Sequence, residues 1–347
     1  MSCFVVIVYI NQFSIRTSNY YNALKSIMKE REGATVKVLV IHNIGSGHGA
    51  GAIYDFIRSY AEDGDTITLR TFNGHTPFAT LLEDARDYDF VVASGGDGTI
   101  AAVTYELRYS DIPILPFPSG TANLLAMNLA SPAEPHALAH LMREQRLMDF
   151  DIGEIELSNG ERFGFSMIAG AGYDAAIMEG AEPSKRLLGP MAYFTAAFAN
   201  FAPQFSRITL TIDGKTVETQ GVGVLAINFS KLQFDISLVH ENLPRDGMFD
   251  IVVMNTHDAV GLIPAILSCM LDRAGEFPSR PDAMEVFRCR ECTVVADPPL
   301  AVQYDGEVTG TMTPFTVRML PEAARFVVSE ECLALYGEES ATPLDLD

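Results

Sequence analysis

The chain has 347 residues, enough for two domains or for three small ones. It carries 24 Lys and Arg against 45 Asp and Glu, and the net charge of −21 disfavours nucleic-acid binding and long-range attraction to anionic bilayers. Five Cys in a chain of this length are not the pattern of a secreted disulfide scaffold, so a reducing, cytoplasmic setting is expected. No stretch reaches the roughly 18 to 20 continuous apolar residues of a membrane-spanning helix.

Residues 1–35 are an extension for which the sequence suggests no function. After it, short β-rich apolar runs alternate with segments of helical periodicity, which is typical of βαβ units around a parallel sheet. A last helix after Pro135 is expected to reach about Met148, so residues 36–148 predict an open α/β domain. The predicted strands of this domain are Val36–His42, Thr66–Thr71, Asp89–Ala93 and Ile112–Pro116.

The pattern of the sequence changes after residue 148. Short strands separated by turn residues follow, and Asp213-Gly214 between two alternating runs indicates a β-hairpin. One helix is predicted from Asn255 or Thr256 to about Asp272. Residues 149–333 thus predict a mainly antiparallel β domain, which an acidic tail follows over 334–347.

Glycines cluster where the first predicted strand meets its helix. Gly45, Gly47 and Ala50 match the dinucleotide fingerprint G-x-G-x-x-G/A, in which backbone N–H groups approach a phosphate. A nicotinamide site also needs an acid at the end of the second strand, and here that strand ends on Arg70 and Thr71. The fingerprint alone is therefore a weak indication, and a Walker A sequence is absent.

A second glycine cluster follows the third predicted strand and reads Gly95-Gly96-Asp97-Gly98-Thr99. Glycine opens the backbone to phosphate oxygens, and the Asp97 carboxylate can hold a divalent cation, orient a hydroxyl or only cap a helix. After the fourth strand, Thr121 and Asn123 stand at a helix start, either as caps or as contacts to a nucleotide. Ligands bind at the carboxyl ends of parallel strands, so three such features at one edge favour a binding site.

These motifs together resemble the catalytic domain of diacylglycerol kinases, which sphingosine kinases and bacterial lipid kinases share. The similarity rests first on Gly95-Gly96-Asp97-Gly98-Thr99 and on Pro118-x-Gly120-Thr121-x-Asn123-x-x-Ala126. It covers roughly residues 36–330, since the second domain adds further motifs in the family's order. These are Gly170-x-Gly172-Tyr173-Asp174-Ala175, Gly189-x-x-x-Tyr193, Pro244-x-Asp246-Gly247 and Tyr304-Asp305-Gly306-Glu307.

The resemblance implies Mg²⁺-assisted transfer of the γ-phosphoryl group of ATP to a hydroxyl of a lipid such as diacylglycerol, a step in phospholipid metabolism. It also implies an N-terminal α/β nucleotide-binding domain, a C-terminal antiparallel β-sandwich-like domain and an active site in the cleft between them. The implied nucleotide-binding residues are Asn43, Gly45, Ser46, Gly47, Gly95, Gly96, Asp97, Gly98, Thr99, Thr121 and Asn123.

The implied catalytic residues are Asp305, Asp97 and Glu307. Asp305 would take the acceptor proton and Glu307 would assist with metal or nucleotide, while Asp97 stays a rival for the role of base. The segment from Leu243 to Met248 resembles a loop that holds a structural Mg²⁺ through Asp246 and the neighbouring carbonyls. An ordinary Asp-Gly turn is an equal alternative for this segment.

Three positions depart from the family pattern. Ile44 replaces a usual proline, Ser166 replaces a common asparagine, and the run after Asn228 lacks the glycine cluster of many relatives. NAD kinase is the alternative enzyme, although its usual run of Thr, Pro, Gly, Ser and Thr before an Ala-Tyr pair is missing. The alternative of another class is a nucleotide-binding regulatory module without catalysis.

The charge of −21 constrains how a lipid kinase would reach its substrate. Contact with a membrane surface would be peripheral, through an apolar patch, a local basic cluster such as Lys185-Arg186, or divalent cations that bridge acidic side chains to lipid. The sequence leaves the identity of the lipid open, and also the oligomeric state, a homodimer included.

Overall fold

The computed structural model describes residues 36–46, 51–62, 64–74, 76–172, 204–230, 243–255 and 284–337. Apart from Val36 and Glu62–Thr66, these residues lie in one compact unit made of Lys37–Ala61 and Ile67–Asp347. None of the helices within these described ranges is long and apolar enough to span a membrane.

The first part of the chain is the predicted open α/β fold. Strand β1 (Lys37–Asn43) pairs in parallel with β3 (Phe90–Gly95), which pairs in parallel with β4 (Ile114–Pro118), and β2 (Thr66–Phe72) lies at the edge. The four strands lie close to the predicted ones. Strands β1, β3 and β4 are buried almost throughout, which gives the near-continuous apolar runs seen in this sequence, whereas the edge strand β2 is mostly half-exposed. The helices are α2 (Ala52–Tyr60), α3 (Phe78–Leu81), α4 (Asp97–Glu106), α5 (Leu124–Asn128) and α6 (Pro135–Glu144), with a 3₁₀ turn at Ala85–Asp87.

The helix predicted to reach Met148 ends four residues earlier, at Glu144. Gln145 takes the left-handed conformation with φ 51°, which terminates α6, and the chain enters strand β5 (Leu147–Glu156) at once. The prediction was wrong because Leu147 and Met148 suit a helix as well as a strand, and only the pairing of β5 decides between them.

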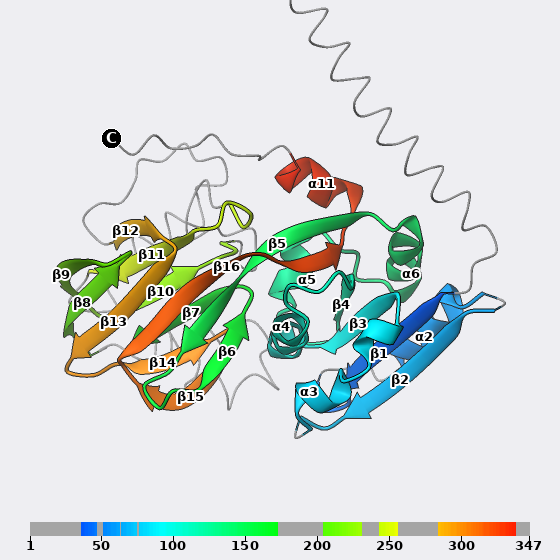
Figure 1. Ribbon diagram of the computed structural model, residues 1–347, viewed down its shortest axis with the longest axis horizontal. Helices are drawn as coiled ribbons and strands as arrows, with labels where there is room; N and C mark the ends of the chain where they lie inside the picture. The colour runs from blue at the N-terminus through cyan, green and yellow to red at the C-terminus, as the bar shows by residue number, and fades with distance from the viewer. Residues whose placement is uncertain are drawn as a thin grey trace, which may run out of the picture. The chain divides into compact units, whose positions relative to one another are not determined.

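Two long strands, β5 and β16 (Phe315–Val327), run side by side in antiparallel register (Figure 1). The far end of β16 also pairs in parallel with β4, at Phe326 opposite Ile114, so the sheet of the α/β part continues into the second half of the fold. The register between β5 and β16 shifts between Leu320 and Ala324, where Glu322 has φ 49°. A bulge of this kind bends the strand, so that β16 pairs with β4 at one end and with β13 at the other.

The second half is the predicted antiparallel sandwich. One layer continues the first sheet through β13 (Glu291–Asp297), β8 (Ser206–Ile212) and β9 (Lys215–Gly221), with β6 (Arg162–Phe165) beside β5. The hairpin predicted at Asp213-Gly214 joins β8 to β9, and both turn residues have positive φ as a two-residue turn requires. The other layer has the order β12 (Met284–Cys289), β11 (Phe249–Met254), β10 (Gly223–Ile227), β7 (Ile168–Gly172), β14 (Ala301–Tyr304) and β15 (Glu307–Met312).

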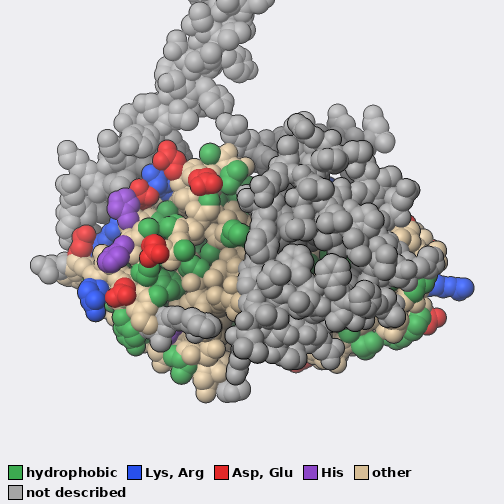
Figure 2. All heavy atoms as spheres, turned by 180° about the vertical axis from the view of Figure 1, so that it is seen from behind, with side chains coloured by type: hydrophobic (Ala, Val, Ile, Leu, Met, Phe, Trp, Pro, Cys, Tyr) green, Lys and Arg blue, Asp and Glu red, His purple; other side chains and the backbone are tan. Residues whose placement is uncertain are grey.

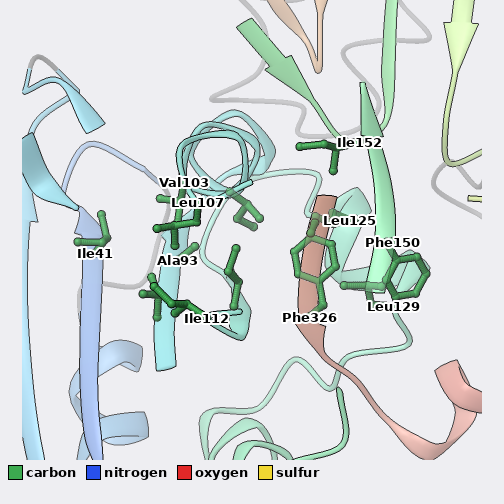
Figure 3. Close-up of a cluster of buried hydrophobic side chains, with 14 of the residues drawn as sticks. Ile41, Ala93, Val103, Leu107, Ile112, Leu125, Leu129, Phe150, Ile152 and Phe326 are labelled. Carbon is green, nitrogen blue, oxygen red and sulfur yellow. The ribbon is translucent and has the colours of Figure 1, made fainter. Parts of the chain in front are cut away.

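Each half has its own apolar core, and β5 and β16 contribute to both. In the α/β core, Phe150 of β5 and Phe326 of β16 belong to the same buried cluster as Ile41 and Leu125 (Figure 3). In the sandwich core, Ile155 of the same β5 and Val317 of the same β16 are completely buried between the two layers. The two halves are therefore joined through shared strands.

The remaining predictions on local structure have mixed outcomes. Helix α11 (Glu330–Tyr336), whose Ser329 side chain accepts the Cys332 N–H, takes up residues 334–336 that were assigned to the acidic tail. Cys289 and Cys292 lie on β12 and β13, on either side of the turn that joins these strands. Both are completely buried in the sandwich core, and their contact with each other and their burial raise the pKa of the Cys289 thiol, as in an inert packed pair. The helix predicted from Asn255 to Asp272 and the basic pair at 185–186 lie outside the described residues.

Acidic and basic side chains are interspersed on the described part of the face that Figure 2 shows.

Candidate active site

Three predicted site segments meet at one edge of the parallel sheet. Asn43 ends β1, Gly95 ends β3 and Pro118 ends β4, and these strands are neighbours in parallel register. Ser94 and Gly95 lie opposite Phe117 and Pro118. The two loops that follow β3 and β4 therefore start side by side, as expected at the carboxyl ends of parallel strands.

These two loops approach each other so closely that they require glycine. A Cβ on Gly120 would lie 2.4 Å from the Gly96 Cα, and a Cβ on Gly95 would lie 2.4 Å from the Thr99 Cβ. The Ser119 N–H also donates to the Gly95 carbonyl at 3.1 Å. The glycines thus bring two backbone loops together and leave their amides without covering side chains.

Asn43 connects the loop after β1 to the glycine cluster after β3. Its Nδ2 donates to Thr99 Oγ1 at 3.0 Å, and its Oδ1 accepts the Gly45 N–H at 2.9 Å. The Ser46 hydroxyl donates to the Asn43 carbonyl at 2.8 Å. Asn43, Gly45, Ser46 and Thr99 therefore lie together, while Gly47 lies outside the described residues.

Asp97 opens α4 but bonds to the start of a different helix. Its Oδ1 accepts the Leu125 N–H of α5 at 3.0 Å. Burial raises the pKa of Asp97, and the neighbouring backbone N–H groups of Leu124, Leu125 and Asn123 act against that rise. In this structure Asp97 thus caps α5 and holds the two glycine loops in register, which is a structural role beside any chemical one.

In the loop after β4, the two predicted nucleotide-binding residues, Thr121 and Asn123, have different environments. The Asn123 side chain accepts the Gly120 N–H at 2.8 Å and donates to the Gly120 carbonyl at 3.0 Å, which stabilises the φ of 52° at Asn123. Thr121 stays exposed at the tip of this loop. Asn123 therefore shapes the loop, and Thr121 is the residue of the pair that a nucleotide can reach.

Asp305 is clamped by the backbone of another strand. It lies in the two-residue turn between β14 and β15, where Asp305 and Gly306 have φ of 42° and 83°. Its Oδ2 accepts the Ser166 N–H at 2.7 Å, and its Oδ1 accepts the N–H groups of Met167 and Ile168 at 2.9 and 3.0 Å. Three such bonds fix the carboxylate in one orientation.

The environment of Asp305 raises the pKa of its carboxyl to about 7. Burial is the largest cause, the three N–H bonds act in the opposite direction, and the negative charge of Asp97 adds to the rise. Partial burial and then the negative charges of Glu307 and Asp305 raise the pKa of the adjacent Tyr304 hydroxyl to about 12. A carboxyl with a pKa near 7 can both accept and release a proton at neutral pH.

Glu307 joins the Asp-Gly-Glu turn to the glycine cluster. A Cβ on Gly98 would lie 3.2 Å from the Glu307 Oε1, so the exposed Glu307 carboxylate rests against the start of α4. Asp97 also lies near enough to Asp305 to affect its titration. The structure therefore brings the three predicted catalytic residues together from opposite ends of the chain.

In the predicted metal-binding loop Leu243–Met248, the Asp246 carboxylate is already paired with an arginine. The Asp246 carboxylate forms an ion pair with Arg288 of β12, and its Oδ1 accepts the Met248 N–H at 2.9 Å. The Leu243 carbonyl is directed to the Asp246 N–H at 3.4 Å. No group of three His, Cys, Asp or Glu suited to a metal occurs in the described ranges. A divalent cation at Asp246 would first have to displace the Arg288 guanidinium, so the residues present do not fit a resident Mg²⁺.

Sequence reasoning missed a buried polar chain under the glycine loops. His42 Nδ1 lies 2.9 Å from Ser94 Oγ, which lies 3.4 Å from Ser119 Oγ. Burial lowers the pKa of His42, which favours the neutral ring. The three side chains link β1, β3 and the loop after β4. Polar residues at the last positions of otherwise apolar strands were the available signal.

Two family models match consecutive parts of the chain. Residues 37–155 match the diacylglycerol kinase catalytic domain, and residues 167–328 match the YegS C-terminal NAD kinase beta sandwich-like domain. The chain is 29% identical over 171 residues to a diacylglycerol kinase of Mycobacterium tuberculosis, which covers 48% of this chain and 55% of that protein. It is 25% identical over 255 residues to a probable lipid kinase YegS-like protein of Xanthomonas axonopodis, covering 71% and 81% of the two chains.

An uncharacterized protein of Synechocystis is 26% identical over 255 residues, or 71% of this chain and 56% of that one. The alignments thus span just over half the length of the Synechocystis and Mycobacterium relatives. A crystal structure of a diacylglycerol kinase from Bacillus anthracis shares the fold, with a TM-score of 0.65 at 21% identity over 86% of this chain and 99% of the other. The two matches together show a diacylglycerol kinase catalytic domain over residues 37–155, followed by a YegS-type C-terminal domain over residues 167–328.

Proposed function

We propose that this protein is a lipid kinase that transfers the γ-phosphoryl group of ATP to a hydroxyl of a lipid such as diacylglycerol. The observation that carries the proposal is the placement of Asp305. Its carboxylate is held by three backbone N–H groups, has a pKa of about 7 and lies beside Asp97 at the start of the glycine cluster. The names of the relatives, diacylglycerol kinase and probable lipid kinase, support the same reaction.

The reaction needs a base at the acceptor hydroxyl and a cradle for the phosphates. The acceptor oxygen forms a bond to the γ-phosphorus, the bond from this phosphorus to the bridging oxygen breaks, and ADP leaves. The hydroxyl proton passes to Oδ2 of Asp305, which has one N–H partner where Oδ1 has two. Asp305 is a better candidate for the base than Asp97, because Asp97 is engaged in capping α5.

ATP enters this proposal as its Mg²⁺ complex, so the cation is part of the substrate. The exposed Glu307 carboxylate at Gly98 is the group that faces this cation. Backbone amides at Gly96 and Gly98 approach the phosphates, and the exposed Thr121 contacts the nucleotide.

A peripheral contact with a bilayer brings the enzyme to its substrate, and the acceptor lipid enters between the two halves of the fold. The excess of acidic residues means that this contact depends on apolar side chains or bridging divalent cations rather than on anionic lipid alone.

The experiment incubates the chain with γ-labelled ATP, Mg²⁺ and a total lipid extract, and in a parallel tube with NAD. Label in the organic phase supports the lipid kinase, and label on NAD supports an NAD kinase instead. ATP binding without transfer to either acceptor would leave only a nucleotide-binding module.

A matched pair of variants tests the base. Asp213 also precedes a glycine in a positive-φ turn, and its carboxylate accepts backbone N–H groups at Arg290 and Glu291. Asp305→Asn should reduce transfer by at least about 10²-fold, the usual contribution of a general base, with ATP affinity unchanged. Asp213→Asn should keep full activity, because it alters the same kind of turn away from the glycine loops. Survival of activity in Asp305→Asn would assign the base to Asp97.

A further inference from the structure

Asn228 is completely buried directly after β10, and its amide connects β5 to the segment between β6 and β7. Its Nδ2 donates to the Asp151 carbonyl of β5 at 2.8 Å and to the Ser166 carbonyl at 3.0 Å. Its main-chain N–H donates to the Met167 carbonyl at 2.9 Å. Asn228 therefore bonds the segment Ser166–Ile168 through two successive carbonyls.

The same two peptide groups bond Asp305 at their other end. The peptide that joins Ser166 to Met167 offers its carbonyl to Asn228 and its N–H to Asp305 Oδ1. The next peptide, which joins Met167 to Ile168, offers its carbonyl to the Asn228 N–H and its own N–H to the same Oδ1. Each peptide is planar, so the direction of its carbonyl fixes the direction of its N–H.

We infer that Asn228 is a positioning residue for Asp305, acting through the Ser166–Ile168 backbone. The inference rests on the proposed function for its consequence in catalysis, but the coupling itself is a property of the structure. Consecutive hydrogen bonds also polarise one another. Donation from Asn228 to each carbonyl therefore strengthens the hydrogen bond that the N–H of the same peptide donates to the Asp305 carboxylate.

The side chain at position 228 acts through its two donors. Within the part of the chain that the structure describes, its Oδ1 has no hydrogen-bond partner, and neither has the buried Ser166 hydroxyl. Asn228→Leu keeps the branch at Cγ but has no donors, so it removes the two Nδ2 bonds, although the Leu side chain is larger. Asn228→Ser, which is smaller and keeps one hydroxyl donor, provides a second variant.

The titration of Asp305 reports on this coupling. Among the described residues, the titratable groups that interact with the Asp305 charge are Asp97 from α4 and Tyr304 from β14, while Glu307 of β15 lies against Gly98. None of these groups bonds Asn228. A change in the pKa of Asp305 on substitution of Asn228 therefore has to pass through the Ser166–Ile168 backbone.

The first measurement uses the unaltered protein. The Asp305 carboxyl carbon and the Asn228 side-chain amide are followed by NMR from pH 5 to 9, with Asp305→Asn to assign the carboxyl signal. The Asn228 amide signals should titrate with the same midpoint as Asp305, near pH 7, and this titration should vanish in Asp305→Asn. Amide signals that stay constant across the Asp305 midpoint would overturn the inference, whatever the stability of any variant.

The second measurement uses Asn228→Leu and Asn228→Ser, with Val253→Ala in β11 as a control that loosens the same sandwich elsewhere. Weaker N–H bonds to the carboxylate should raise the Asp305 midpoint by about 0.5 to 1 pH unit in the Asn228 variants. The pH profile of kcat/KM should move upward by the same amount, and kcat should fall about tenfold because the base is less well placed. Val253→Ala should leave both midpoints unchanged.

The two possible failures can be told apart. If the Asp305 carboxyl titrates with the same midpoint in the unaltered protein and in folded Asn228 variants, the positioning role of Asn228 is refuted. If the chain phosphorylates no lipid, the proposed function fails, and the NMR midpoints still decide the role of Asn228. If both variants unfold, the titration of the Asn228 amide in the unaltered protein decides.

Discussion

The contact between Gly96 and Gly120 allows the fold and the ligand role of the glycine loops to be tested separately. A methyl group at position 120 would lie 2.4 Å from the Gly96 Cα and 3.2 Å from the Gly96 N, both of which are backbone atoms. A methyl group at position 96 would lie 3.6 Å from the Gly120 Cα, an ordinary contact, and Gly96 has φ −82° and ψ 179°, which any residue adopts. At this contact, an added methyl group is therefore tolerated at position 96 but not at position 120.

Gly120→Ala should destabilise the protein because the loops after β3 and β4 must move apart by about 1 Å. Overpacking of this kind costs about 1 to 3 kcal/mol. With roughly 2 to 4 °C per kcal/mol for a domain of 150–250 residues, Tm should fall by about 2 to 12 °C. Gly96→Ala should leave Tm within about 1 °C, but its methyl group would stand where a phosphate approaches the backbone. The affinity for ATP should then fall at least about tenfold, or about 1.4 kcal/mol.

The assay is thermal unfolding by circular dichroism for both variants, and calorimetric titration with ATP and Mg²⁺ at a temperature where both are folded. An unchanged Tm in Gly120→Ala would refute the close approach of the two loops. Full ATP affinity in Gly96→Ala would refute the proposal that this loop receives the phosphates.

Three further outcomes are expected. Because Asp305 accepts a proton only when ionised, kcat/KM should fall about tenfold per pH unit below pH 7, and a flat profile from pH 5 to 8 would contradict a base with this pKa. Tyr105→Phe removes the 2.6 Å bond from the Tyr105 hydroxyl to the Glu154 carboxylate and should lower the free energy of unfolding in urea by about 1 to 2 kcal/mol, whereas a loss below about 0.3 kcal/mol would show that water replaces this bond. Because Arg288 already neutralises Asp246, removal of divalent cations by EDTA should leave Tm within about 1 °C. In Arg288→Ala, Tm should rise with added Mg²⁺. An EDTA-sensitive Tm in the unaltered protein would support the interpretation of Leu243–Met248 as a metal-binding loop.

The elements that local sequence patterns determine were predictable. Strands β1, β3 and β4 of the parallel sheet are buried and therefore read as apolar runs, and the Asp213-Gly214 turn carries its own conformational signal. The end of α6 was not predictable, since the choice between helix and strand at Leu147 depends on pairing with β16, about 180 residues later. Helix α11 was also missed, although Ser329 is an ordinary N-cap.

The candidate site shows the same division. The convergence of Asn43, Gly95 and Gly120 follows from parallel strand order, which alternation along the sequence implies. The meeting of Asp305 with Ser166–Ile168 depends on which strands pair in the sandwich, and nothing local in the sequence specifies it. The resemblance to a family identified Asp305 and Glu307, but it did not indicate the backbone clamp or the buried asparagine behind it.

The sharing of β5 and β16 between the two cores has a consequence for how the gene can be divided. The catalytic-domain model ends at residue 155, but the sheet there still lacks the strand that pairs with β4, and Phe150 would lose Phe326 beside it. A fragment that stops at this boundary exposes a strand edge and part of its apolar core, which is the pattern that leads to aggregation. The recognisable sequence module is thus shorter than the smallest piece that can fold, and the second half of the chain must be synthesised before the first can complete its sheet.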